Sequence, residues 1–302
     1  MKADNKQVNN NYLVEITTIQ TSSFRTTIES LKEILKDVPI KFIPDRKDEN
    51  NNIIQGGISI VAMNESMSVL IRLKLFSKSF EKFYISEEIK QPIIIGINMN
   101  CFNKLIKTIG NDETLTLFLE RDDPNKLGIK IHNVVKGHIT IYKLNLLELE
   151  KKKELNAPEA EFNSAISMPA NDFHKIIRDS QVIGEVIDIT FIDSIDTPNR
   201  LIFKCQGEFA TIEVALVAKE KNNNTKTDEI IIQGLYDLKI LSLFSKCANL
   251  CQNIDIYMKN NYPLIIKYQI ANLGVLFIVL SPKDISDKLN DDYDDEYSDE
   301  DI

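Results

Sequence analysis

Lys104 and Lys107 stand three residues apart in residues 99–110 (MNCFNKLIKTIG), a stretch with helical periodicity. At about 100° of rotation per residue, its apolar side chains share one side: Phe102, Leu105, Ile106 and Ile109. Both lysines fall on the other side, and no acidic residue lies between Cys101 and Ile109. Cations on a rigid helix contact phosphates without reading bases, so the pattern favours sequence-independent binding of nucleic acid.

Residues 22–38, 169–182 and 235–250 also combine an apolar stripe with basic positions, which predicts three further amphipathic helices. Their basic positions are Arg25, Lys32 and Lys36, then Lys175 and Arg178, then Lys239 and Lys246. Ser22 or Ser23 is expected to cap the first helix, and Glu29 interrupts its basic stripe. A lysine opposite an apolar stripe is usually only solvated. Four such faces, two in each half, favour a shared role.

Residues that could do catalysis form no recognisable constellation. His132, His138 and His174 have no triad or metal-ligand spacing, and the GxGxxG, P-loop, HExxH and GxSxG motifs are absent. Acidic residues are numerous, so counting leaves a two-metal carboxylate site open, although the acids before Pro124 belong to an ordinary turn. We therefore expect a protein without catalytic residues, bound metal or cofactor.

Four cysteines occur, none in a CxxC pair and none beside a histidine: Cys101, Cys205, Cys247 and Cys251. Free buried thiols in a reducing compartment are the expected state, in preference to a metal site or a disulfide. No apolar run reaches the roughly 18 residues that a membrane helix requires. Residues 1–11 have no apolar core of a signal peptide. An intracellular soluble protein is the expectation.

The formal net charge of −9 is concentrated at the end of the chain. Residues 291–301 (DDYDDEYSDED) hold eight acids and no base, which leaves 36 basic and 37 acidic residues in the remainder. A nearly neutral body can carry a one-sided basic face, so the overall acidity does not argue against nucleic acid. We expect residues 1–11 and the acidic tail, residues 284–302, to be disordered.

The strand and helix signals repeat in the two halves of the chain. Each half reads as a strand, a helix, several strands, a second helix and further strands, which predicts an α+β fold with two similar domains. The expected domains are residues 12–145 and 162–283, joined by a connector over residues 146–161 that is rich in Glu and Lys. Residues 44–56 are expected to form a surface loop.

Four stretches in this order resemble the proliferating cell nuclear antigen (PCNA) family, the eukaryotic-type DNA sliding clamps. They are FRTTIESLKEIL from Phe24, MNCFNKLIKTIGNDETLTL from Met99, SMPANDFHKIIRDSQVIGE from Ser167 and YPLIIKYQIANLGVLFIVLSPK from Tyr262. The resemblance covers about residues 12–283, and the ordered set is more specific than any one stretch. It implies the DNA clamp fold, in which helices line the inside of a closed homotrimeric ring and antiparallel sheets lie outside.

The resemblance also implies positions for three surfaces. Family positions facing duplex DNA match Arg25 and Lys32, Lys104 and Lys107, Lys175 and Arg178, and Lys239 and Lys246, and helical spacing adds Lys36. The subunit contact pairs two edge strands, matching His138, Ile139, Thr140, Ile141 and Tyr142, and Phe209, Ala210, Thr211, Ile212 and Glu213. The pocket for partner peptides matches Met63, Met67, Leu70, Leu155, Ala157, Phe162, Pro263, Ser281 and Pro282.

The function implied is that of a DNA polymerase processivity factor, which encircles duplex DNA and recruits replication and repair proteins. The implied partners are DNA polymerase, a clamp loader and proteins with PCNA-interacting peptide motifs. The rivals are a checkpoint-type heterotrimeric clamp, a clamp-fold peptide scaffold that does not encircle DNA, and an enzyme. The Asn, Ile and Lys content suggests an AT-rich viral or protist genome. The expected location is the nucleus, or a cytoplasmic viral replication site.

Overall fold

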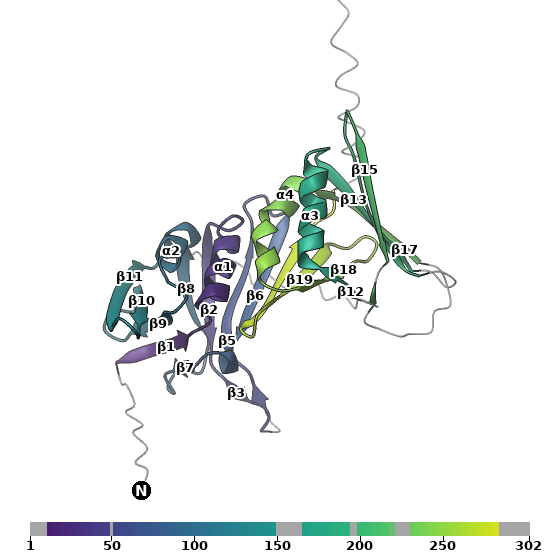
Figure 1. Ribbon diagram of the computed structural model, residues 1–302. Coiled ribbons are helices and arrows are strands. Elements are labelled where there is room, and N and C mark those ends of the chain that lie inside the picture. Colours follow the sequence, from purple (N-terminus) through teal and green to yellow (C-terminus); the bar gives the residue numbers. More distant parts are fainter. Residues whose placement is uncertain are drawn as a thin grey trace, which may run out of the picture. The chain divides into compact units, whose positions relative to one another are not determined.

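The computed structural model describes residues 11–48, 51–148, 165–193, 198–217, 219–220 and 230–283. The chain divides into two compact units. The first comprises Met1–Asn64, Ile71–Asn156 and Gln269–Leu276, and the second comprises Glu65–Leu70, Ala157–Tyr268 and Phe277–Ile302. None of the helices in the described ranges is long and apolar enough to cross a membrane. The described residues form four α-helices and mostly antiparallel strands, which makes the fold α+β, as the sequence predicts (Figure 1).

The first unit contains a five-stranded antiparallel sheet in the order β11-β10-β9-β1-β7. Its strands are β1 (Tyr12–Thr18), β7 (Lys82–Ile85), β9 (Thr114–Glu120), β10 (Lys126–Asn133) and β11 (His138–Asn145). A second group of strands in this unit has the order β8-β2-β5-β6. These are β2 (Asp37–Ile43), β5 (Gly57–Met63), β6 (Val69–Phe76) and β8 (Ile93–Asn98). The predicted surface loop over residues 44–56 instead contains a small hairpin, β3 (Arg46–Lys47) and β4 (Ile53–Ile54).

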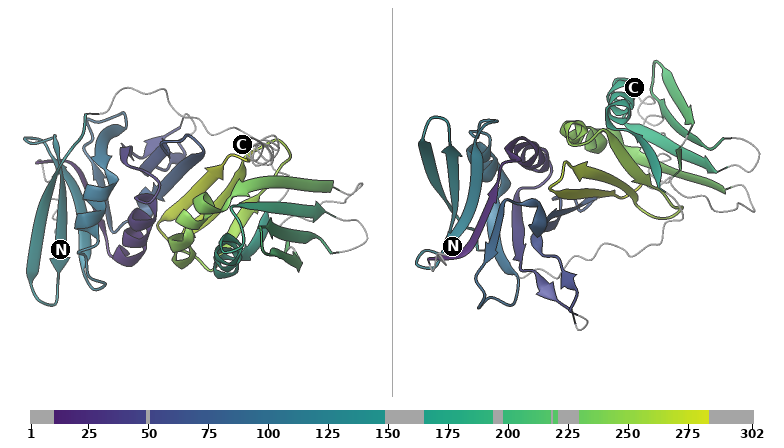
Figure 2. Two further views of the ribbon diagram at one scale, coloured as in Figure 1. Left: turned by 90° about the horizontal axis from the view of Figure 1, so that it is seen from above. Right: turned by 60° about the horizontal axis from the view of Figure 1, so that its bottom comes forward.

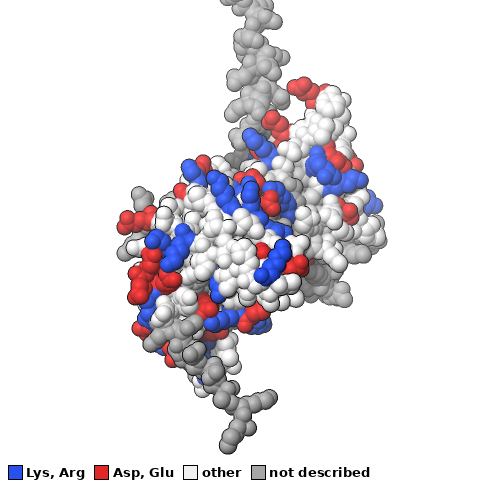
Figure 3. All heavy atoms as spheres, turned by 60° about the vertical axis from the view of Figure 1, so that its left-hand side comes forward, with Lys and Arg blue, Asp and Glu red and all other residues white. Residues whose placement is uncertain are grey.

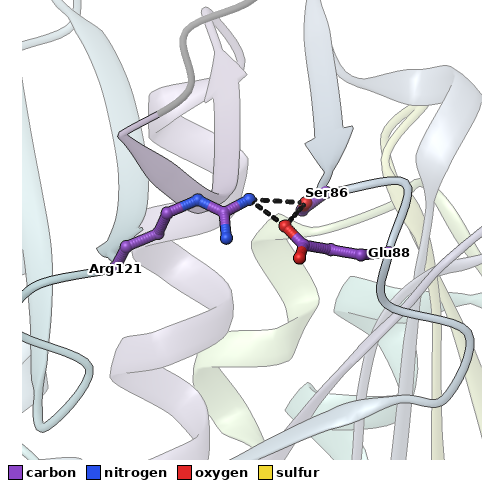
Figure 4. Close-up of polar contacts among 3 residues, drawn as sticks. All are labelled: Ser86, Glu88 and Arg121. Carbon is purple, nitrogen blue, oxygen red and sulfur yellow. Dashed lines mark hydrogen bonds and ion pairs between the residues drawn. The ribbon is translucent and has the colours of Figure 1, made fainter.

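Polar contacts attach the loop that follows β7 to the end of β9. Arg121 Nη2 donates a hydrogen bond to Ser86 Oγ, 2.8 Å away, and forms an ion pair with Glu88 (Figure 4). The bonds from Arg121 and Ser86 lower the pKa of the Glu88 carboxyl group. These contacts lie at the β7 end of the sheet. β11, at the opposite end, is the longer edge strand.

α1 (Thr21–Leu31) and α2 (Met99–Ile106) lie side by side in the first unit (Figures 1 and 2). Phe24 and Phe102 are both buried, and their rings meet edge to face with centroids 6.4 Å apart. Aromatic pairs prefer this geometry, which fixes the two helices against each other. The apolar stripes predicted for these helices therefore face the core, as Phe24 and Phe102 show.

The predicted start and end of α1 are wrong. Its N-cap residue is Gln20, without a side-chain cap hydrogen bond, and Ser22 and Ser23 lie inside the helix. The helix ends at Leu31 and not at residue 38. Beyond it the backbone forms a tighter turn with hydrogen bonds such as that from Ile34 N–H to Leu31 O (3.1 Å), and the chain then enters β2. α2 begins as predicted but ends at Ile106, four residues early.

The second unit contains a four-stranded antiparallel sheet in the order β15-β14-β13-β17. Its strands are β13 (Val186–Asp193), β14 (Arg200–Gln206), β15 (Thr211–Val217) and β17 (Ile230–Asp237). A further group of strands has the order β16-β12-β18-β19-β20. These are β12 (Ile166–Pro169), β16 (Lys219–Glu220), β18 (Asn253–Tyr257), β19 (Leu264–Ile270) and β20 (Gly274–Leu280).

α3 (Ala170–Gln181) matches the helix predicted over residues 169–182, and it packs beside α4 (Leu238–Leu243). The single helix predicted over residues 235–250 is wrong. Residues 235–237 continue β17, and the helix is divided into α4 and a 3₁₀ turn, η2 (Ser245–Asn249). Asp237 sets the start of α4, because its carboxylate accepts a hydrogen bond from Ile240 N–H at 3.1 Å.

Candidate nucleic-acid and subunit-contact surfaces

The two lysines of α2 extend from the side of the helix opposite its core contacts. Phe102 and Ile106 are fully buried, so Lys104 and Lys107, at the complementary angles, are exposed. Asn98 holds the start of the helix: its Oδ1 accepts a hydrogen bond from Cys101 N–H (3.0 Å), and its Nδ2 donates one to Asp37 (2.7 Å). The lysines thus stand on a rigid element, as phosphate contacts require.

Arg25 of α1 has a structural role that its spacing did not predict. Its guanidinium donates to Ile109 O at 2.5 Å and to Asn111 Oδ1 at 2.9 Å, in the turn that follows α2. The same turn receives a bond from Thr21, whose hydroxyl donates to Gly110 O (3.3 Å). Glu113 accepts the Gly110 N–H at 2.7 Å, and this bond lowers the pKa of its carboxyl group. Arg25 therefore joins α1 to α2.

Lys32 and Lys36 do not continue the basic face of α1. Lys32 is the C-cap residue and forms an ion pair with Glu33 at 3.1 Å. Lys36 is exposed, but it lies in the bend before β2, beyond the end of the helix. The predicted stripe of Arg25, Lys32 and Lys36 on one helix is wrong, because α1 ends at Leu31.

In the second unit, the exposed cations of α3 and α4 are Lys175, Arg178 and Lys239. Lys246 is half-buried in η2 and already interacts with another group of the protein. Lys175 and Arg178 line a broad hollow between α3 and the α4–η2 segment, and Asp172 lies on the same wall. We call this feature the α3–α4 hollow. Its opposite wall includes Ser242 and Asn249.

Five of the predicted cations share one property. Their side chains are exposed and have no hydrogen-bond or ion-pair partner among the residues that the structure describes: Lys104, Lys107, Lys175, Arg178 and Lys239. On the face drawn in Figure 3, Lys and Arg gather in the upper middle with a few acids among them, whereas acids gather at the left-hand margin. Unpaired cations on helices remain available to external phosphates.

A buried polar pair lies beneath the cations of α3. His174 Nε2 and the hydroxyl of Tyr268 on β19 are 3.0 Å apart, and both side chains are buried. Burial lowers the pKa of His174 to about 4, and burial also raises the pKa of Tyr268 well above its ordinary value. The imidazole is therefore neutral at pH 7, and the pair connects α3 to the strand below it.

The strands predicted to contact another subunit lie at sheet edges. β11 contains His138, Ile139, Thr140, Ile141 and Tyr142, and β15 contains Thr211, Ile212 and Glu213. Each strand is at one end of its sheet, and its outer side pairs with no strand in the described part of the chain. Phe209 and Ala210 were also expected in the strand, which is wrong: they form the turn before β15, because Ala210 O accepts the Gly207 N–H at 3.0 Å. Phe209 is 74% exposed.

The opposite edges of the same two sheets are protected. β7 has only four residues, and Lys82 at its start forms an ion pair with Glu15. At β17, the side-chain amide of Asn260 bonds to the strand backbone in both directions, accepting from Gln233 N–H (3.1 Å) and donating to Ile231 O (2.9 Å). Short, charged or covered edges resist pairing with another chain. Neither residue type nor spacing indicates this role for Asn260.

The positions predicted for the peptide pocket are only partly described. Leu155, Ala157 and Phe162 lie outside the described residues. Met63 ends β5, and Met67 is 70% exposed with a left-handed φ of 54°. Leu70 is buried at 7% exposure, whereas Pro263 is half-buried and Ser281 and Pro282 are exposed. The pocket remains a prediction.

Two further features concern chemistry. Across the described ranges, no group of three or more His, Cys, Asp or Glu side chains is placed to hold a metal ion. Cys205 and Cys247 are buried and Cys251 is half-buried. Cys101 is exposed on α2, so the expectation of buried thiols is wrong for this residue.

Models of the two proliferating cell nuclear antigen domains match nearly the whole chain. The N-terminal domain model matches residues 13–155, and the C-terminal domain model matches residues 156–283. The chain therefore belongs to the proliferating cell nuclear antigen family.

Two viral proteins illustrate its relatives. A probable DNA polymerase sliding clamp of Acanthamoeba polyphaga mimivirus is 27% identical over 314 residues, covering 94% of this chain. The present chain spans 65% of the length of that protein. Probable DNA polymerase sliding clamp 1 of Paramecium bursaria Chlorella virus 1 is 28% identical over 273 residues, covering 90% of this chain and 97% of that protein.

Proposed function

We propose that this protein is a DNA polymerase processivity factor, a sliding clamp that surrounds duplex DNA and holds a polymerase on its template. Membership of the family supports this function, and so do the names of the two viral relatives. The protein does no chemistry of its own. A closed ring cannot leave the duplex, and its basic lining makes weak phosphate contacts that exchange as it slides.

The observation that carries the proposal is the set of unpaired cations on the helices of both units. Lys104 and Lys107 in the first unit and Lys175, Arg178 and Lys239 in the second are exposed and have no partner in the described parts of the structure. Their helices are fixed by buried contacts, so no ordering of the backbone is needed when phosphate binds. No base-reading geometry is needed, which suits a protein that moves over any sequence.

The partner of the chain is a second copy of itself. β11 and β15 are open edges of seven or eight residues, whereas β7 and β17 are protected. Pairing β11 of one subunit with β15 of the next is heterologous, and such contacts close into a ring when the rotation permits. Three subunits close the ring, and a clamp loader, the polymerase and peptide-motif proteins bind to it.

A polymerase primer-extension assay on circular DNA tests the function. Changing Lys104 and Lys107 to Glu should abolish the increase in product length that the clamp gives, because repulsion replaces attraction at the phosphates. The matched control changes Lys78 and Lys90 to Glu, since both are exposed lysines of the first unit outside α1 and α2. Full stimulation by the helix variant would contradict the proposal and favour a scaffold that does not encircle DNA.

A further inference from the structure

The α3–α4 hollow combines polar walls with cations that have no intramolecular partner. Lys175 and Arg178 line it, and neither forms a hydrogen bond or ion pair with another described side chain. The acidic groups near them are Asp172, on the same wall, and Asp179, exposed beside Arg178. His174 below is neutral, because burial lowers its pKa to about 4. Lys175 and Arg178 are therefore available to pair with carboxylates from outside the described residues.

The chain itself supplies such a polyanion close to this hollow. Residues 284–302 contain ten acidic residues and one lysine. They begin directly after Lys283, whose N–H donates to Leu235 O at 2.8 Å and whose Nζ lies 3.5 Å from Asp237 Oδ2. Asp237 is the N-cap of α4. The acidic segment thus starts at the first turn of a helix that borders the hollow.

The length of the segment permits contact with the hollow. Eight residue-to-residue steps separate Lys283 from Asp291, and they reach up to about 26 Å when extended. Ser242, on the wall of the hollow, is four residues into α4 and hence about 6 Å along the helix axis from its start. Tethering at this short range gives the carboxylates a local concentration on the order of millimolar, so weak ion pairs suffice for occupancy.

We propose that residues 291–301 occupy the α3–α4 hollow of their own unit when DNA is absent, and that duplex DNA displaces them. The inference rests on the proposed function only in that DNA is the competing ligand. The segment screens Lys175 and Arg178 from other polyanions. A protein that binds phosphate without reading sequence would otherwise associate with any nucleic acid. With the segment in place, only a nucleic acid that displaces it reaches Lys175 and Arg178.

The test neutralises the segment in the full chain by changing the eight acids of residues 291–301 to Asn or Gln. Binding to a short duplex is measured by fluorescence anisotropy at about 50 mM and about 300 mM salt. The neutral-tail variant should bind at least about threefold more tightly at low salt, because the competitor is lost, and the difference should disappear at high salt. An unchanged affinity at low salt would overturn the inference.

Two matched backgrounds distinguish occupation of the hollow from an effect of net charge. Combined with Lys175→Gln and Arg178→Gln, the neutral tail should give no gain in affinity, since the segment has lost its site. Combined with Lys104→Gln and Lys107→Gln, which removes the same charge from α2, the gain should persist. Equal gains in both backgrounds would show a general electrostatic effect and contradict the assigned site.

A readout without DNA separates this inference from the proposed function. A photoreactive amino acid at Tyr293 of the full chain should cross-link to α3 or to the α4–η2 segment, as located by mass spectrometry after digestion. Adding duplex DNA should reduce that yield. Cross-links confined to other elements would overturn the inference. Cross-linking to the hollow without any binding of DNA would leave the contact standing and contradict the clamp function.

Discussion

Asn260 Oδ1 lies 3.1 Å from the amide nitrogen of Gln233, and the same side chain donates to Ile231 O at 2.9 Å. One side chain thus supplies the donor and the acceptor that a neighbouring strand would offer to β17. Ile230 and Ile231 on this strand are 42% and 55% exposed, which makes an uncovered edge here a hazard. Asn260 therefore leaves β15 as the unprotected edge of this sheet.

Changing Asn260 to Ala should create a second open edge. We expect assemblies larger than those of the wild type, growing with protein concentration, because β17 then pairs with strands of other molecules. Light scattering after gel filtration measures the mass distribution. Asn272→Ala is the control, since Asn272 is exposed in the turn between β19 and β20. If Asn260→Ala keeps the wild-type mass at every concentration, the amide does not protect the edge.

Periodicity predicted the parts of the fold that depend on local pattern. α2 and α3 begin within one residue of their predicted starts, because their apolar side chains recur at helical spacing up to the cap. α4 was predicted too early because residues 235–237 fit a helical stripe as well as a strand. The β-sheet pairing of Leu235 with Asp188 decides between the two, and this is a contact between distant residues.

The candidate site was predictable in its residue types but not in its tertiary contacts. Lys104 and Lys107 share an exposed face, as their spacing indicated. Arg25 fitted the same pattern, yet it bonds to Ile109 O, 84 residues away. The protection of β17 by Asn260 crosses 27 residues through side-chain geometry alone. Spacing identifies residues on one face, whereas only the folded chain shows which of them are already engaged.

Arg25→Gln should destabilise the protein, whereas Lys107→Gln should not. Arg25 bonds to the turn after α2, so its loss should lower the free energy of unfolding by about 1 kcal/mol, discounted for its partial exposure. Urea denaturation at fixed protein concentration measures this, because assembly shifts apparent stability. Lys107 is exposed and unpaired, which makes it the matched control. Equal free energies of unfolding for the two variants would contradict a structural role for Arg25.

His174 should make the protein less stable as the pH falls. Its pKa is about 4 in the folded state, against an ordinary value of 6.5, because burial disfavours the charged form. The unfolded chain therefore binds more protons between these values, and stability falls as the pH drops from 6.5 to about 4. A shift of this size corresponds to a loss on the order of 3 kcal/mol.

His174→Gln should remove this part of the pH dependence. Urea denaturation at about pH 7 and about pH 5 gives the stability difference for each variant. Wild type should lose more stability than His174→Gln over this interval, even if the substitution lowers stability at both pH values. His132→Gln, in β10 of the first unit, controls for the loss of a histidine. An equal pH dependence in wild type and His174→Gln would contradict the assignment.

Ile141→Glu should dissociate the proposed ring without unfolding the subunit. Ile141 is 55% exposed on the open edge strand β11, so a carboxylate there is solvated in the monomer. In the assembled ring it would be brought against β15, where Glu213 is also exposed, and the burial and repulsion of these charges oppose association. Light scattering at micromolar concentration should give a trimer for wild type and a monomer for the variant, with the two circular dichroism spectra alike.

Val135→Glu is the matched control, because Val135 is 89% exposed in the turn just before β11 and outside the strand. The Val135→Glu variant should remain trimeric. A trimeric Ile141→Glu protein would exclude β11 from the contact, and a monomeric wild type would exclude the homotrimer.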